Sequence, residues 1–320
     1  MSLASWVTLL IMMNYQIYKG KPVKKLLVIL SLAALAACTK TTSEAPKATA
    51  SAPAFVLDYS ANCTDKGAPT ISGNSVTFGS GTQCQAGRIV ATQSYTNITE
   101  FRATVDLSRL SNNYVNASIY MVSNPAQPTV QPIGSNYCDA GGNGNQWNCR
   151  EIDFMETNGN KLFQTTMHLG DGGSAAPQRY EYSYASTALN NSCFNSANMK
   201  NDPAKGLHDI TGIDMSKPFD MVATFTYDTP KMVVTYQQGS ASVVVYDSSA
   251  IGAEGSSSLN MTDLTASMKN GYWPVISFWQ GYSPTGPSSA PWWNGSCGWG
   301  ALCNNTGSYW SISNIQVTTK

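Results

Sequence analysis

Three acidic side chains stand close together in a sequence that is otherwise poor in acids. They are Glu151, Asp153 and Glu156, in the segment Glu-Ile-Asp-Phe-Met-Glu. The apolar neighbours indicate a β-strand, in which residues 151 and 153 point to one face and residue 156 to the other. One β-bulge between 153 and 156 returns Glu156 to the first face, and bulges are common beside active sites. The spacing therefore predicts a bulged strand with three acids on one face.

Two carboxyl groups held about 5.5 Å apart suit glycoside hydrolysis with retention of configuration. One carboxylate attacks the anomeric carbon while the other, kept protonated beside its charged neighbour, donates a proton to the leaving oxygen. The alternative is a solvated edge strand that tolerates three acids on its exposed face. Ile152, Phe154 and Met155 argue against that alternative, because they predict that the other face of the strand is buried. We therefore interpret the segment as a catalytic strand.

The same segment resembles the bulged catalytic motif of glycoside hydrolase family 16 (laminarinases and relatives) and family 7 (cellobiohydrolases and endoglucanases). These families share a jelly roll of the concanavalin A type. The resemblance implies that Glu151 is the nucleophile, that Glu156 is the general acid/base, and that Asp153 hydrogen-bonds the nucleophile. It also implies a histidine on the next strand, and His168 stands at a comparable distance. A purely structural histidine is an equal alternative.

Further segments lean toward family 7, in a patchy likeness over roughly residues 100–280. The chain departs from that family in its shorter length and smaller number of cysteines, and from family 16 in having Arg150 before the motif. These features favour a divergent member of the wider clan. The segments that resemble family 7 are Asn116–Ser123, Asn136–Asp139, Glu156–Asn158 and Ile276–Trp279.

Aromatic residues near the motif and in a late Gly/Pro-rich segment could form a sugar-binding cleft, because indoles stack on the apolar faces of sugar rings. Trp147, four residues before Glu151, is the best candidate for a subsite beside the cleaved bond. For Trp279 and Trp310, which lie inside β-type runs, a place in the core is the favoured alternative. Asn158 is a candidate for hydrogen bonds to sugar hydroxyls. The candidate stacking residues are Trp147, Trp279, Trp292, Trp293 and Trp299.

The composition suits an uncharged, hydroxyl-rich ligand, although many secreted β proteins share it, and the family resemblance implies that the ligand is a β-glucan. The 320 residues carry a formal net charge of zero and only 12 % charged residues, with 16 Tyr and 8 Trp. Nucleic acid and anionic membrane surfaces favour clustered Lys and Arg, so neither is an expected partner. With two histidines and no zinc-type cysteine spacing, we expect no metal site or cofactor, although such folds can carry a structural calcium. We expect a monomer.

Short β-type runs, separated by Gly, Asn, Ser and Pro, must position these side chains. Several alternate apolar with polar residues at period two, which is typical of strands with one buried face. Asn260–Met268 is the best candidate for a short helix, and the last run is expected to return and pair with the first. The pattern predicts one all-β sandwich over residues 55–320, and the family resemblance implies that it is a jelly roll of two antiparallel sheets. The clearest runs are Ser75–Phe78, Glu100–Asp106, Ala117–Val122, Phe219–Tyr227, Met232–Tyr236, Ser242–Tyr246, Pro274–Trp279 and Tyr309–Val317.

The N-terminal segment has the features of an export signal. Several lysines precede an apolar run, residues 26–37, that is too short to span a bilayer, which needs about 20 residues. Leu35-Ala36-Ala37-Cys38 resembles the lipobox of bacterial lipoproteins, which implies that Cys38 is lipidated and that residues 1–37 are removed. An ordinary signal peptide is the alternative, and Met12 or Met13 is an alternative start. Residues 38–54 then form the lipidated cysteine and a flexible tether, so we expect anchoring at the bacterial envelope, periplasmic or surface-facing.

Seven further cysteines would enter an oxidising compartment, where disulfides are expected. Short spacings favour the pairs 63–84, 138–149 and 297–303 and leave Cys193 unpaired, but the sequence does not fix this connectivity. The leading function is a retaining endo-acting β-glucanase on β-1,3, β-1,3-1,4 or β-1,4 links. The alternatives are a non-catalytic, lectin-like surface lipoprotein and a glucan transglycosylase on the same site.

Overall fold

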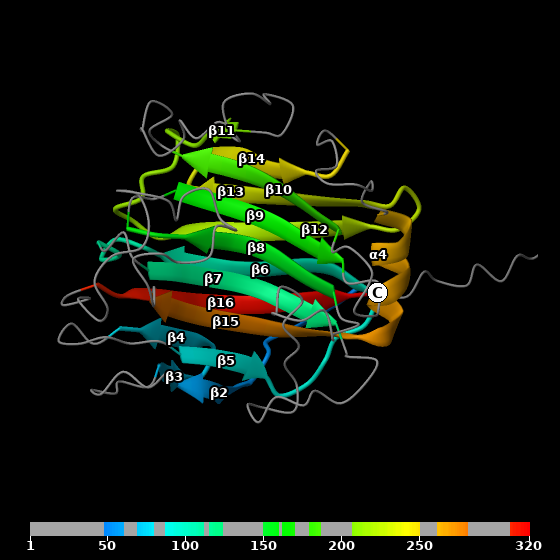
Figure 1. Cartoon of the computed structure of the whole chain (residues 1–320), viewed down its shortest axis with the longest axis horizontal. Coiled ribbons are helices and arrows are strands. Elements are labelled where there is room, and N and C mark those ends of the chain that lie inside the picture. The colour runs from blue at the N-terminus through cyan, green and yellow to red at the C-terminus, as the bar shows by residue number, and fades with distance from the viewer. Residues whose placement is uncertain are drawn as a thin grey trace, which may run out of the picture. The chain divides into compact units, whose positions relative to one another are not determined.

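Strands account for most of the chain that the structure describes (Figure 1). The computed structural model describes residues 48–60, 69–79, 87–111, 115–123, 150–159, 162–169, 179–186, 207–249, 261–280 and 308–320. Side chains are described in these ranges except at positions 58–60, 168–169, 179–184, 186, 207, 263 and 279–280. All of these residues belong to one unit, Ala48–Lys320.

The strands form two eight-stranded sheets. Sheet 1 has the order β14-β13-β12-β6-β16-β4-β3, with β1 paired to β16 off this path. Its strands are β1 (Thr49–Ser51), β3 (Thr70–Ser72), β4 (Ser75–Phe78), β6 (Ile98–Asp106), β12 (Phe219–Thr226), β13 (Lys231–Gln238), β14 (Ala241–Asp247) and β16 (Trp310–Thr319).

Sheet 2 has the order β11-β10-β9-β8-β7-β15-β5-β2 and faces the viewer in Figure 1. Every pair in the two sheets is antiparallel except β10 with β11, which is parallel. Its strands are β2 (Phe55–Ser60), β5 (Gly87–Ala91), β7 (Val115–Ser123), β8 (Arg150–Thr157), β9 (Leu162–Leu169), β10 (Arg179–Ser186), β11 (Leu207–Asp209) and β15 (Tyr272–Gln280).

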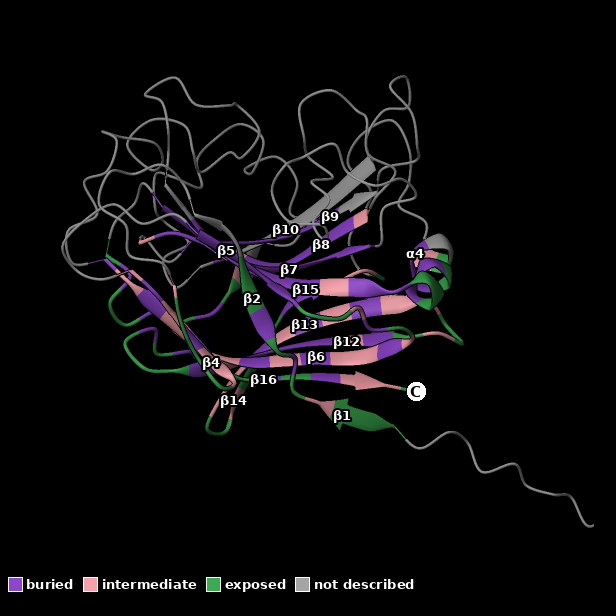
Figure 2. Ribbon diagram, turned by 90° about the horizontal axis from the view of Figure 1, so that it is seen from below, coloured by how far each residue is buried: buried purple, intermediate pink, exposed green. Residues whose placement is uncertain are grey.

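The two sheets stack as layers with the buried residues between them, and α4 (Met261–Ser267) lies at one end (Figure 2). Aromatic rings from both sheets meet in this core. The rings of Phe101 on β6 and Phe154 on β8 stack at a centroid distance of 5.1 Å, and Phe163 on β9 meets Tyr236 on β13 at 5.3 Å. Burying one such side chain stabilises the fold by roughly 1.5–3 kcal/mol. The predicted jelly-roll sandwich of two antiparallel sheets is confirmed.

The predicted β-type runs correspond to strands, and the predicted helix corresponds to α4 followed by the 3-10 turn η3 (Met268–Asn270). Trp310 is buried and stacks on Phe78 at 5.2 Å, as expected of a core residue. No helix in the described ranges is long and apolar enough to cross a membrane.

The first and last strands pair, as the sequence predicts. Thr49, Ala50 and Ser51 of β1 lie opposite Thr319, Thr318 and Val317 of β16. These three residues fall within the segment interpreted as a flexible tether, so the strand structure begins before Phe55. The pairing is possible because Thr and Ser suit an exposed edge strand, whose side chains need not contribute to the core.

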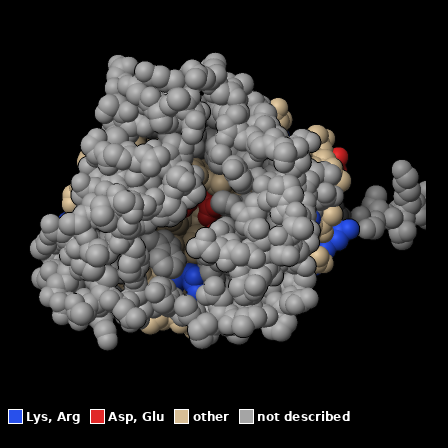
Figure 3. All heavy atoms as spheres, viewed as in Figure 1, with Lys and Arg blue, Asp and Glu red and all other residues tan. Residues whose placement is uncertain are grey.

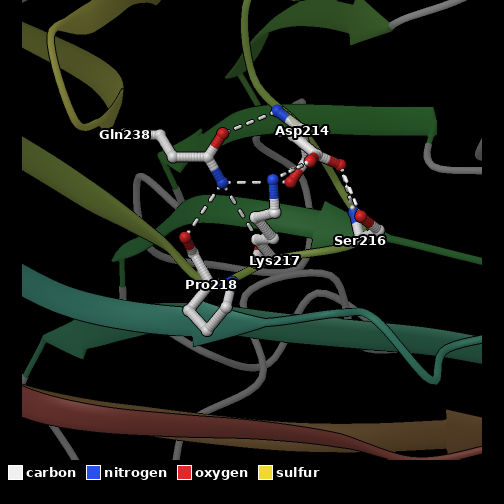
Figure 4. A network of polar contacts seen from close by, with 5 residues as sticks. All are labelled: Asp214, Ser216, Lys217, Pro218 and Gln238. Carbon is white, nitrogen blue, oxygen red and sulfur yellow. Dashed lines mark hydrogen bonds and ion pairs between the residues drawn. The ribbon is translucent and has the colours of Figure 1, made fainter.

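A polar network fixes the turn that leads into β12 (Figure 4). The Gln238 amide accepts a hydrogen bond from the backbone N–H of Asp214 at 2.7 Å and donates to the carbonyl oxygens of Asp214 and Pro218 at 3.0 and 2.9 Å. A hydrogen bond from Lys217, at an Nζ–Oδ2 distance of 2.8 Å, and further bonds from Ser216 lower the pKa of Asp214 to about 2. One side chain of β13 thus adds several hydrogen bonds to the backbone of the turn, beside the turn's own bond from Lys217 N–H to the Asp214 carbonyl oxygen.

Candidate active site

The catalytic-strand candidate, β8, contains the predicted bulge. On β7 the consecutive residues Ile119 and Tyr120 pair with Met155 and Asp153, so Phe154 is an extra residue on β8. The register with β9 shifts in the same place, between Asp153 and Glu156. The pairing of β8 with both of its neighbours therefore shows one inserted residue, and it lies where the spacing of the three acids requires a bulge.

The bulge turns two successive apolar side chains toward the core. Phe154 and Met155 are both fully buried in the main hydrophobic cluster. The Phe154 carbonyl oxygen accepts a hydrogen bond from Thr165 Oγ1 at 3.0 Å, in a buried environment. Burial of two large side chains and a partner for the carbonyl oxygen together stabilise a local break in strand alternation.

The three acids consequently share the face of sheet 2 that points away from the core. In the register with β7, Glu151, Asp153 and Glu156 lie opposite Val122, Tyr120 and Ser118, which alternate along that strand. Glu151 and Asp153 are buried, and Glu156 is half-buried. In Figure 3, drawn from this side, acidic residues are visible near the middle of the face.

Asn116 on β7 orients the carboxyl group of Glu156. Its Nδ2 donates a hydrogen bond to Glu156 Oε1 at 2.7 Å. The nitrogen end of this amide faces Glu156, whose Oε1 can accept the bond whether or not the other carboxyl oxygen carries a proton. On β9, directly opposite Glu156, Gln164 Nε2 donates to Thr166 Oγ1 at 2.5 Å. Glu156 thus lies between two side-chain amides, one on each neighbouring strand.

The face around the acids is divided into a polar and an apolar part. One cross-strand line of aligned residues is hydrophilic, and we call it the polar row: Arg88, Ser277, Ser118, Glu156 and Gln164. Beside it lies a separate small hydrophobic cluster, which we call the apolar floor: Val90, Tyr120, Val122 and Val275, with Trp273 partly buried against them. A surface with hydrogen-bonding groups along one line and apolar groups along the next suits an amphipathic ligand such as a sugar.

Of the other predicted site residues on strands, the structure describes some only by backbone. His168 lies on β9, the strand that follows β8, and its backbone pairs with that of Glu151. Trp279 on β15 pairs with Asn116. Neither side chain is among those described, so the roles of both remain predictions. Asn158 follows β8 directly and is buried.

The remaining predicted residues lie outside the described ranges, and their roles also remain predictions. They are the lipidation candidate Cys38, the tryptophans Trp147, Trp292, Trp293 and Trp299, and the cysteines Cys63, Cys84, Cys138, Cys149, Cys193, Cys297 and Cys303. In the part of the chain that is described, no group of three or more His, Cys, Asp or Glu residues could hold a metal ion.

Sequence reasoning missed the side chains that surround Glu156 on the neighbouring strands. Asn116, Ser118 and Tyr120 stood only in a segment that resembled family 7, and Gln164 carried no signal of its own. Their positions follow from strand pairing and register, which a single sequence fixes poorly. Once the register is known, alternation along β7 and β9 identifies all four.

Comparison with known proteins gives similarity at the level of solved structures alone. No family model and no curated protein matches the chain. An endoglucanase I complexed with cellobiose is 14 % identical, with 77 % of each chain covered and a TM-score of 0.47. A GH7 family cellobiohydrolase from Daphnia pulex is 18 % identical over 77 % of this chain and 79 % of the other, with a TM-score of 0.46. A protein from work on endo-acting O-glycanases of the human gut microbiota is 13 % identical over 83 % and 91 %, with a TM-score of 0.43.

Proposed function

We propose that this protein is a retaining glycoside hydrolase that cuts β-glucan at the acid-bearing face of sheet 2. The observation that carries the proposal is the bulge at Phe154, because it brings Glu151, Asp153 and Glu156 to one face. An ordinary strand would send Glu156 into the core. Endoglucanases and a cellobiohydrolase are among the similar solved structures, while the proposal rests on the geometry of β8 itself.

In this mechanism Glu151 attacks the anomeric carbon and Glu156 donates its proton to the glycosidic oxygen, so that the carbon–oxygen bond breaks and the aglycone leaves as an alcohol. The resulting glycosyl ester on Glu151 is attacked by water. Glu156, now ionised, takes the proton of that water, and the sugar leaves with its original configuration. Both carboxyl groups return to their starting protonation states.

Three features around the two glutamates support this mechanism: a hydrogen bond to Glu156, a third acid and an apolar surface. Asn116 holds the carboxyl group of Glu156 through its hydrogen bond at 2.7 Å. Asp153 lies on the same face between the two glutamates, where a third carboxyl group favours retention of a proton in the cluster. The apolar floor beside Glu151 offers a surface for the apolar face of a sugar ring.

Hydrolysis of a panel of polysaccharides tests the proposal. Purified residues 39–320 are incubated with laminarin, lichenan, barley β-glucan and carboxymethylcellulose, beside Glu151→Gln and Glu156→Gln. We expect release of reducing ends from at least one glucan, and loss of that activity in both variants while binding persists. Binding without release of reducing ends in the wild type would instead favour the lectin-like alternative. A rise in longer oligosaccharides rather than reducing ends would favour the transglycosylase.

We also propose that the protein is exported and anchored by lipid on Cys38, which rests on the lipobox-like Leu35-Ala36-Ala37-Cys38. Expression of the full chain in a bacterium with radiolabelled palmitate should label the wild type and leave Cys38→Ser unlabelled. Equal labelling of both proteins would contradict the assignment.

A further inference from the structure

Three buried polar atoms around Glu156 have no hydrogen-bond partner within the described part of the protein. They are Asn116 Oδ1, Ser118 Oγ and Gln164 Oε1. The residues are only 6 %, 3 % and 6 % exposed, so bulk water does not simply solvate them. Ser118 and Gln164 lie directly opposite Glu156 on its two sides, and Asn116 is hydrogen-bonded to it.

Such a concentration is unusual, because folded proteins satisfy nearly all of their buried polar groups. The other buried side-chain atoms without a hydrogen-bond partner in the described ranges belong to residues outside β7 and β9. Where several gather around one carboxyl group, partners from outside the chain are the natural explanation. Polar groups that await a ligand cost stability in the free protein and are a common feature of functional sites.

The orientation of the two amides defines what those partners must be. The nitrogen of Asn116 is engaged with Glu156 and that of Gln164 with Thr166, so each amide presents its carbonyl oxygen. These oxygens only accept hydrogen bonds, and the Ser118 hydroxyl can do so as well. A fitting ligand therefore brings hydrogen-bond donors to both sides of Glu156.

The geometry points to two hydroxyl-binding subsites that flank Glu156, one on β7 made by Asn116 and Ser118 and one on β9 made by Gln164. This inference rests on the proposed function and adds which sugars the hydrolase accepts. Glu156 protonates the oxygen that joins two sugars, so the subsites contact free hydroxyl groups of the sugars on either side of the cleaved bond. The site thus selects neutral sugars that are unsubstituted at these positions.

Substituted sugars fit poorly for two physical reasons. A methyl ether has no proton to donate, so it leaves the carbonyl oxygens of Asn116 and Gln164 without partners. A sulfate or carboxylate group would in addition be repelled by the three neighbouring acids. Discrimination of this kind is strong where a site is built to hydrogen-bond a hydroxyl group, because the buried groups of the site are otherwise left unpaired.

The test compares Ser118→Ala and Gln164→Met with Ser267→Ala on the polysaccharide that the wild type cuts fastest. Ser267 is the matched control, since it is a buried serine on α4 whose Oγ lies 2.6 Å from both the Leu264 carbonyl oxygen and the Tyr272 hydroxyl. We expect kcat/KM to fall roughly three- to tenfold in each of the two site variants and to stay unchanged in the control. We expect the opposite for stability, with Tm unchanged or raised in Ser118→Ala and lowered in Ser267→Ala.

A second measurement determines whether the sugars on either side of the cleaved bond must carry free hydroxyl groups. Partially O-methylated polysaccharide is digested, and mass spectrometry locates the methyl groups in the products. We expect the two sugars at the newly formed ends to be unmethylated, whereas methyl groups distributed there as in the interior would overturn the inference.

The outcomes separate the inference from the proposed function. Full activity in both site variants, or losses that merely follow Tm as in the control, would show that water alone fills these positions and overturn the inference while the hydrolase stands. A wild type that neither cuts nor binds any polysaccharide of the panel would overturn both.

Discussion

The bulge at Phe154 is the feature on which the site depends, so its anchor in the core should matter for catalysis as well as for stability. Phe154 is fully buried, and its ring lies 5.1 Å from that of Phe101 and 6.1 Å from that of Phe225. Phe154→Ala removes these contacts and leaves a cavity, which costs about 3–5 kcal/mol of unfolding free energy. Without that anchor, Glu156 loses its fixed position on the outer face.

Phe101→Ala is the matched control, because Phe101 stacks on Phe154 from the opposite sheet and its truncation opens a cavity in the same part of the core. Urea unfolding should show a similar loss of stability, about 3–5 kcal/mol, in both variants. Glucan hydrolysis is then compared at a temperature where both variants remain folded by circular dichroism. We expect kcat to fall at least tenfold in Phe154→Ala and to remain within about twofold of the wild type in Phe101→Ala.

Equal losses of kcat in the two variants would refute this reasoning, since a cavity alone would then explain them. Full activity in Phe154→Ala would refute it as well, because the bulge would then persist without its anchor. Leucine at either position gives a milder pair, with an expected loss of roughly 1–3 kcal/mol, should an alanine variant fail to fold.

Three further predictions concern the groups that hold the fold around the site. Thr165→Val removes the hydrogen-bond donor to the buried Phe154 carbonyl oxygen and should lower the unfolding free energy by about 1–3 kcal/mol in urea titration; no change would show that another donor replaces it. Gln238→Leu removes the bonds that fix the turn before β12 and should cost about 1 kcal/mol, whereas an unchanged urea midpoint would mean that the turn holds without them. Because the pKa of Asp214 is lowered from 3.8 to about 2, its contribution to stability is present above pH 3.8 and is lost as the pH falls toward 2. Unfolding midpoints measured across that interval should therefore fall more steeply in the wild type than in Asp214→Asn, and parallel curves would contradict this assignment.

The sequence predicts the architecture well because alternation is strong in the strands that line the core. Glu100–Asp106 and Phe219–Tyr227 alternate around buried residues such as Phe101 and Met221, and both runs correspond to strands. Edge strands such as β3, whose three residues are all exposed, carry no such pattern and were not predicted. An edge strand buries little, so its residue types are weakly constrained.

The site was predictable to the extent that it lies on one strand. The spacing of Glu151, Asp153 and Glu156 required an inserted residue, and the register confirms it at Phe154. The groups that complete the site come from β9, which follows β8 closely in the chain, and from β7, β15 and β5, which longer segments separate from it. Their alignment depends on which strands pair and in what register, and the local sequence does not determine either.

The central claim is that Glu151 forms a covalent bond with the sugar while Glu156 assists from the same face. A 2-deoxy-2-fluoro glycosyl fluoride of the preferred glucan unit tests it most directly, because the fluorine slows release of the intermediate and allows the labelled peptide to be identified by mass spectrometry. We predict one adduct per chain, on Glu151, and none in Glu151→Gln. An adduct on a different residue, or inverted product from the unlabelled substrate, would contradict the mechanism.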